Sequence, residues 1–404
     1  MSTSTNKLFK FIFCLGLFLS PFIFWSNAPI AYEIPRVWFL NRWIELMALL
    51  GIFSFRQKQA NSRKDGFLIL LVWLFVLIAV IASLLGVDMA KSFWGNMYRS
   101  DGLFTFFHLL GLFFLLALFW QKEWQYPMAV SIVAGSSFVS FWNMGVGLRL
   151  YFLQGQSFLQ PIGTTFGQPN FLAGYLLICL AFISYLHEKT KNLFFKRLLF
   201  LALISHFLAI IFTLSRAGIL GIVLFLLLRA FFLKKRYLKQ VIMITFLFAF
   251  CLGAVFLYKT LNSKEIYIAD NRVRIFTKGL MGTAKRPFLG WGWANFDHAF
   301  ESVDWPMKLT NDVYVDKAHS HFLEILATTG ILGLIFYLLI IFHVFKKLLS
   351  ENIVSQWFLL VFVLFILHSQ TNVISIAEEL IFWIILGITA SQKPSKENSA
   401  VKFK

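Results

Sequence analysis

The chain has 404 residues, of which 59% are hydrophobic and only 14% are charged, and its formal net charge at pH 7 is +18. A soluble fold of this length has no need for so much apolar surface, and apolar runs of about 17 to 22 residues, the length that spans a bilayer, recur along the sequence. The composition therefore predicts an all-α, polytopic integral membrane protein and leaves no room for a separate soluble domain.

The apolar runs predict about twelve transmembrane helices. The first could instead be a signal peptide, because Lys7 and Lys10 lie at its start, but Trp and Phe crowd the region where cleavage would fall and favour an uncleaved span. The expected spans are Leu8–Trp25, Val37–Phe55, Gly66–Leu85, Leu103–Trp120, Met128–Met144, Phe171–Leu186, Leu198–Thr213, Ala217–Phe232, Val241–Leu257, Phe322–Phe345, Trp357–His368 and Ile374–Ile388.

The positive charges predict the orientation of these spans. The segments that we place inside hold 22 Lys and Arg residues, the short outside segments hold 6, and the long segment from Lys259 to Ser320 holds 9. Long loops cross the membrane whatever their charge, so the short segments decide the orientation. We therefore expect both termini in the cytoplasm and the long loop outside. The +18 charge is then largely a topology signal and does not indicate a nucleic-acid partner.

The domain organisation follows from the same pattern. We expect one transmembrane domain at residues 1–391, with a large outward-facing loop at 259–320 between the ninth and tenth spans, and a polar cytoplasmic tail at 392–404. Within the loop, Asp270–Met281 carries apolar residues at roughly helical spacing with Arg and Lys between them. This pattern predicts an amphipathic helix lying at the membrane surface.

Cationic residues near the outer membrane edge are the first functional candidates. Arg216 opens the eighth span, where it could either snorkel to water or aim its guanidinium at a lipid phosphate. The loop cations Arg272, Arg274, Lys278, Lys285 and Arg286 could attract a surface helix to anionic lipids, or one or two of them could fold back to meet Arg216.

Two histidines, His319 and His321, flank Ser320 where the tenth span begins. At a spacing of two residues they do not share a helix face, so we do not expect them to bind a metal together. An unperturbed pKa of about 6.5 would let one of them accept a proton near neutral pH. Since the sequence contains no Asp-x-Asp clamp, Walker loop or nucleic-acid module, we expect no metal, no cofactor and no nucleic acid.

Several motifs, taken in order, resemble the O-antigen ligase and polymerase superfamily of bacterial membrane glycosyltransferases. Ser215–Gly218 (SRAG) is similar to the family's Ser-Arg-Gly/Ala segment, and Pro287–Phe296 (PFLGWGWANF) to its Pro-x-x-Gly-x-Gly element. Ala318–Leu323 (AHSHFL) is similar to the family's Ala-His-Asn-x-x-Leu signature, with Ser320 in place of Asn. Segments around Arg99 and at Phe166–Phe171 also resemble the superfamily.

The resemblance implies a metal-independent, inverting transfer of a glycan from a polyprenyl (undecaprenyl) pyrophosphate to a hydroxyl of lipid A core, another glycan or a protein. In this hypothesis His319 is the catalytic base. Arg216, with Arg274 and Arg286, binds the donor pyrophosphate, whose leaving group gathers negative charge. Arg99 and His321 are candidate contacts to the acceptor or the donor.

Three alternatives stay open from the sequence. Two lie within the same superfamily, namely a polysaccharide polymerase and a protein O-oligosaccharyltransferase. The third, a twelve-helix transporter, lacks support because no basic signature loop and no matching halves are evident. The expected location is the bacterial cytoplasmic membrane, with the active site facing the periplasm or the exterior.

Overall fold

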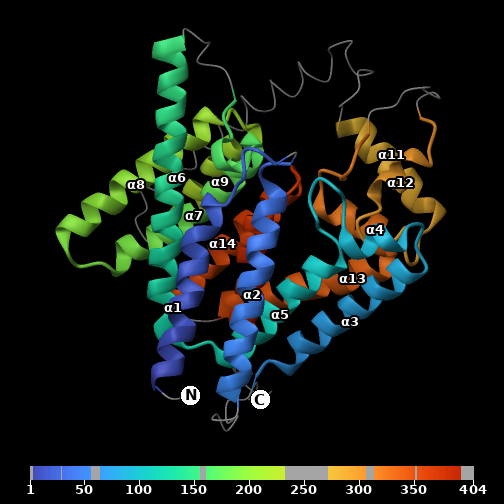
Figure 1. The fold of residues 1–404 in the computed structure, drawn as a ribbon, viewed down its shortest axis with the longest axis horizontal. Coiled ribbons are helices and arrows are strands. Elements are labelled where there is room, and N and C mark those ends of the chain that lie inside the picture. The colour runs from blue at the N-terminus through green and yellow to red at the C-terminus, as the bar shows by residue number, and fades with distance from the viewer. Residues whose placement is uncertain are drawn as a thin grey trace, which may run out of the picture.

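The computed structural model describes residues 3–28, 30–55, 64–154, 161–232, 272–305, 314–350 and 353–392, and within these ranges all regular structure is helical (Figure 1). The longer helices are α1 Thr3–Leu19, α2 Glu33–Phe55, α3 Gly66–Leu84, α5 Leu103–Phe119, α6 Gln125–Gln154, α7 Pro169–Lys189, α8 Leu193–Phe212, α9 Arg216–Phe232, α11 Arg272–Lys285, α13 His321–Ser350, α14 Ile353–Ser369 and α15 Ile376–Ser391. Shorter elements are α4 Met89–Trp94, α12 Phe296–Glu301 and the 3-10 turns η1 Ser20–Phe22, η2 Lys122–Trp124 and η3 Thr164–Phe166.

Five helical segments are long and apolar enough to cross a membrane, namely Gly66–Leu84, Lys122–Leu153, Pro169–Lys189, Leu193–Phe212 and His321–Leu349. The prediction of an all-α, multi-pass membrane protein is thereby confirmed for the described residues. Every predicted span except the ninth coincides with a described helix, while Val241–Leu257 lies outside the described residues. The number of twelve crossings stays a prediction.

The helices place the predicted outer connections at one end of the bundle. There, the Val87 amide donates to the Trp291 carbonyl at 3.1 Å, and the Ile376 amide donates to Glu33 Oε2 at 3.0 Å. At the opposite end, the Asp65 amide donates to the Ala390 carbonyl at 3.0 Å. We call the first end, with the connections 85–102, 286–295 and 314–320, the loop end. Figure 1 shows α4, α11 and α12 at this end, far from the N mark, and Lys91 of α4 pairs with Asp297 of α12.

The predicted loop helix is present as α11, but its faces differ from the expectation. Ile275 is buried against Phe296 and Phe300, whereas Val273 and Leu280 are exposed. The buried face also holds Arg274 and Lys278, with Lys278 Nζ lying 3.9 Å from the centroid of the Phe300 ring. Long cationic side chains can pack their aliphatic stems and heads against an aromatic ring, so apolar side chains are left facing outward. Residues 259–271 and 306–313 of the predicted loop lie outside the described residues.

A backbone contact joins the Pro287–Gly292 segment to a kink in α13. At the kink, Gly330 has φ 68° and ψ −171°, a conformation that is essentially restricted to glycine. The amides of Trp291 and Gly292 donate to the carbonyls of Ala327 and Thr328, each at 2.9 Å, and the Ile331 amide donates to the Pro287 carbonyl at 2.8 Å. The segment thus satisfies backbone groups that the kink removes from the helical hydrogen-bond pattern.

Candidate active site

A cavity opens at the loop end, with a volume of about 810 Å³ when the space open to solvent is included. Its lining comes from the start of α2, the connection before α5, the 293–294 turn, the start of α13 and the connection between α14 and α15. The polar lining residues include Glu33, Arg99, Asp101, Lys317, His319, His321, Glu324, Asn372 and Glu379. Trp293, Phe106, Leu109 and Val37 add apolar surface, so the cavity suits an amphiphilic ligand.

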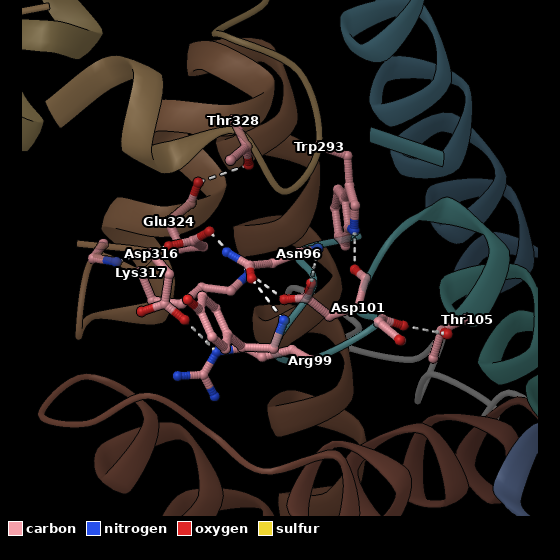
Figure 2. Close-up of polar contacts among 12 residues, drawn as sticks. Asn96, Arg99, Asp101, Thr105, Trp293, Asp316, Lys317, Glu324 and Thr328 are labelled. Atoms are coloured by element: carbon pink, nitrogen blue, oxygen red, sulfur yellow. Dashed lines mark hydrogen bonds and ion pairs between the residues drawn. The ribbon is translucent and has the colours of Figure 1, made fainter. Parts of the chain in front are cut away.

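Two neighbouring ion pairs close one wall of the cavity (Figure 2). Arg99 Nε donates to Asp316 Oδ2 at 2.6 Å, and Lys317 Nζ lies 2.5 Å from Asp101 Oδ2. Glu324 also accepts from Lys317 Nζ, at 3.2 Å. We call the pairs Arg99–Asp316 and Asp101–Lys317 the ion-pair clasp. It joins segments more than 200 positions apart in the chain.

Tight turns position the first half of the clasp. Gly95 and Ser100 have positive φ angles of 91° and 51°, and the Asn96 amide donates to Asp101 Oδ1 at 3.1 Å. A Cβ atom on Gly95 would lie 2.3 Å from the amide nitrogens of Asp101 and Gly102, so this close turn requires glycine. The turn therefore fixes the backbone that carries Arg99 and Asp101.

The clasp also fixes the ionisation of its central pair. Burial alone would raise the pKa of Asp101, but the adjacent Lys317 ammonium outweighs it and holds that pKa below its usual value. Burial would lower the pKa of Lys317, but the carboxylates of Asp101 and Glu324 raise it above its usual value. Both groups are therefore charged at neutral pH.

The His319 turn is held from two sides. Glu324 Oε2 accepts the Ala318 amide at 2.8 Å, and Gln370 Oε1 accepts from Ser320 Oγ and from the Phe322 amide, both at 3.1 Å. His319 itself adopts φ 54°, which is uncommon for a residue other than glycine. Ser320, which replaces the Asn of the family pattern, directly precedes α13. Its side chain is thus used to anchor the turn.

The structure brings three of the six predicted site residues together, because His319, His321 and Arg99 line the same cavity. The other three do not line it. Arg216 is the exposed first residue of α9, and Arg274 is buried on α11. Arg286 donates to the Leu85 carbonyl at 3.4 Å, with its guanidinium carbon 4.9 Å from the Trp291 ring centroid.

Sequence reasoning missed the carboxylates and the lysine of this wall. Lys317 and Glu324 flank the histidine motif and could have been noticed as charges at a membrane edge. Arg99 and Asp101 carry a positive and then a negative charge, whereas Asp316 and Lys317 carry a negative and then a positive charge. This complementary order of charges was an available signal. No local pattern identified Glu33 as a cavity residue. Glu379 could be noticed as an acidic residue beside a predicted span that either pairs internally or lines a polar cavity, and it lines this cavity.

Arg36 is one of the six positive charges expected in the short outside segments, and the structure buries it. Its side chain is 0% exposed and uses all three guanidinium nitrogens. Nε donates to the Ser20 carbonyl at 3.1 Å, Nη1 to Glu33 Oε1 at 2.8 Å and Nη2 to the Thr165 carbonyl at 2.9 Å. Arg36 therefore ties α2 to η1 and η3 and holds Glu33 at the cavity edge.

Comparison with known proteins agrees with the motifs. A family model described as O-antigen ligase matches residues 198–338, a range that contains Arg216, Arg274, Arg286, His319 and His321. The ComP-specific O-oligosaccharyltransferase of Acinetobacter baylyi (strain ATCC 33305 / BD413 / ADP1) is 25% identical over 365 residues. This alignment covers 81% of the present chain and 63% of that protein, so the chain spans less than two thirds of the relative's length. The family match, the relative and the ordered motifs together support a likeness of this chain to the O-antigen ligase superfamily.

Proposed function

We propose that the protein transfers a glycan from a polyprenyl pyrophosphate to a hydroxyl of an acceptor such as lipid A core, at the outer face of the cytoplasmic membrane. The observation that carries this proposal is the cavity at the loop end. His319 and Arg99 both line this one space, in a chain that is similar to the O-antigen ligase family. A base and a cation beside one amphiphilic cavity are what a hydroxyl nucleophile and an anionic leaving group require.

The proposed reaction is a displacement at the anomeric carbon. His319 takes the proton of the acceptor hydroxyl while the acceptor oxygen bonds to the anomeric carbon, and the bond from that carbon to the pyrophosphate oxygen breaks. The electron pair leaves with the polyprenyl pyrophosphate, and attack from the opposite side inverts the anomeric centre. Cationic side chains stabilise the leaving group, so the proposed reaction is metal-independent.

Arg216, Arg274 and Arg286 are proposed to bind the donor pyrophosphate. This role rests on the motif resemblance, since none of the three lines the described cavity. Arg216→Lys keeps the charge but removes the planar fork, so it is expected to be nearly as inactive as Arg216→Ala. Transfer by the two variants is compared at matched protein levels.

Within this proposal, residues 1–391 form one transmembrane domain with both termini in the cytoplasm, and 392–404 form a cytoplasmic tail. A protein acceptor is the second candidate, because the relative's name specifies an O-oligosaccharyltransferase. Transfer to a growing lipid-linked glycan, as in a polymerase, is the remaining alternative within the superfamily.

Purified protein in liposomes without an ion gradient tests the proposal. The samples receive a polyprenyl-pyrophosphate-linked glycan and, separately, lipid A core, a second lipid-linked glycan or a pilin-type protein. We expect transfer to one acceptor class, and we expect it to persist in EDTA. Movement of the intact donor across the bilayer without transfer would identify a transporter instead, and loss of transfer in EDTA with recovery on adding a divalent ion would overturn the metal-independent chemistry.

A further inference from the structure

Arg99 is held in the cavity wall by one atom of its guanidinium. Nε donates to Asp316 Oδ2 at 2.6 Å, and the guanidinium carbon lies 5.3 Å from the centroid of the buried Phe171 ring at the start of α7. The structure gives Arg99 no further hydrogen bond within the described part of the chain. Figure 2 shows the two terminal nitrogens pointing away from Asp316.

Arg36 shows what a structural arginine looks like in the same molecule. It is 0% exposed, and each of its three nitrogens donates to an oxygen of the protein. Arg99 lines the cavity, and its side chain is 15% exposed. Of its guanidinium nitrogens, only Nε donates a hydrogen bond to a residue that the structure describes. The edge formed by Nη1 and Nη2 is therefore available to a ligand, in the geometry that grips a phosphate or carboxylate with two parallel hydrogen bonds.

Three carboxylates that line the cavity already pair with other cations. Asp101 and Glu324 both bind Lys317, and Glu33 binds Arg36. Asp316 orients the Arg99 guanidinium before any ligand arrives, and Phe171 limits its movement on the other side. A side chain held in its binding geometry loses less conformational entropy when the ligand binds.

We propose that Arg99, oriented by Asp316, is an anion-binding residue of the His319 cavity and binds an oxyanion of a substrate beside the reacting bond. This inference rests on the proposed function for the identity of the substrates. The shared chemistry is a phosphate or carboxylate, which could belong to the donor pyrophosphate or to an anionic acceptor. Asp316 is a positioning residue in this scheme, because it acts through Arg99.

The test compares Arg99→Gln, Asp316→Asn and the reciprocal double variant Arg99→Asp/Asp316→Arg. Each is assayed for thermal stability, for the KM of donor and of acceptor, and for binding of inorganic pyrophosphate by calorimetry. We expect Arg99→Gln to weaken pyrophosphate binding and to raise one KM by about 10- to 100-fold, the range for loss of charged hydrogen bonds. The donor KM rises if the anion is the donor's, and the acceptor KM rises if it is the acceptor's.

The double variant separates binding from structure. It restores an ion pair between the two positions but removes the guanidinium from position 99, so we expect it to recover stability and not substrate affinity. Recovery of both would show that Arg99 is only structural. Arg42→Gln is the matched control, because Arg42 is an exposed arginine on α2 that pairs with Glu45 and does not line the cavity. It should leave every measurement unchanged.

The two proposals fail in different ways. If the wild-type protein transfers no glycan to any acceptor, the proposed function is wrong, and Arg99 is then judged by pyrophosphate binding alone. If the wild type is active, but Arg99→Gln changes neither KM and binds pyrophosphate as the wild type does, the inference is wrong and the function stands.

Discussion

At the scale of single residues, the two histidines beside Ser320 share a cavity but differ in their surroundings. His319 lies in the strained turn before α13, at φ 54°. His321 is the first residue of that helix, and its ring centroid lies 5.2 Å from that of Tyr337. The turn therefore presents His319 to a ligand from a fixed backbone, while the ring of His321 packs against the bundle.

We expect His319→Ala to lose about 10²- to 10⁴-fold in the rate of glycan transfer, as for removal of a general base. His321→Ala should be mild, because the family motif matches at His319 and not at His321. The measurement is in vitro transfer with matched protein levels. A fully active His319→Ala beside an inactive His321→Ala would show that the wrong histidine was chosen, and full activity in both would remove the base from the mechanism.

Lys317 and Lys347 form a second informative comparison, because both pair with an aspartate. Lys317 pairs with Asp101 at the cavity, and Lys347 pairs with Asp65 at 2.9 Å near the other end of α13. Replacing Lys317 by Met leaves Asp101 and Glu324 without their lysine, and removing one partner costs about 3–5 kcal/mol when a pair is fully buried. Replacing Lys347 by Met leaves Asp65 with His343 Nε2 at 2.8 Å. The Lys347 pair is the drier of the two, with side chains 6% and 5% exposed against 15% and 19%.

We therefore expect both Lys317→Met and Lys347→Met to lower the thermal midpoint, because each removes a lysine from a buried carboxylate. Only Lys317→Met should reduce glycan transfer at temperatures where both variants are folded, because Lys317 shapes the wall beside His319. Equal residual activity in the two variants would mean that the clasp contributes stability alone. Circular dichroism melts and the transfer assay on the same preparations decide between these outcomes.

At the scale of elements, the apolar runs predicted most helices correctly, because the length and apolar composition of a run are enough to identify a helix that could span a membrane. The faces of α11 could not be predicted in the same way. Periodicity shows which residues share a face, but not which face meets the rest of the protein. Arg274 and Lys278 are buried because they pack against Phe300 of another helix, α12. No pattern within the sequence of α11 predicts that contact.

The kink of α13 at Gly330 predicts that this position does not tolerate a larger residue. A Cβ atom there would lie 2.2 Å from the carbonyl group of Phe288, in addition to the unfavourable φ of 68°. We expect Gly330→Ala to destabilise the protein by more than the roughly 1–3 kcal/mol of backbone strain alone. The thermal midpoint of the detergent-solubilised protein measures this loss.

Gly145→Ala on α6 is the control for that substitution, because a Cβ atom at Gly145 meets no heavy atom within 4 Å. It should be neutral or slightly stabilising, as alanine favours the helix. If Gly330→Ala were as stable as this control, the contact between Pro287–Gly292 and α13 would be looser than the structure shows.

At the scale of the whole molecule, the sequence predicted the membrane class, and three of the six predicted site residues, His319, His321 and Arg99, line one cavity. His319 and His321 were found because a motif marks them. The clasp was not found, because Arg99 and Asp316 are far apart in the chain and their distance of 2.6 Å depends on how α3, α5 and α13 pack. Charge patterns report membrane topology reliably, but they do not report which charges meet.

The orientation of the molecule is open to a direct test. Lys285 is exposed at the loop end, and Lys122 is exposed in η2 at the opposite end. With Cys14, Cys179 and Cys251 replaced, we expect a membrane-impermeant maleimide added to intact cells to label Lys285→Cys and not Lys122→Cys. Labelling in the reverse pattern would invert the topology and place the cavity in the cytoplasm. Permeabilised cells, in which both sites should react, provide the control.

The ion-pair clasp has a consequence for how the chain assembles. Its two pairs have opposite polarity, since Arg99 meets Asp316 while Asp101 meets Lys317. If the 95–102 turn docked with the two contacts exchanged, Arg99 would face Lys317 and Asp101 would face Asp316. Both contacts would then be repulsive, and in a partly buried site like-charge contacts are costly. The order of charges in the clasp thus favours the alignment seen in the structure and disfavours the exchanged one.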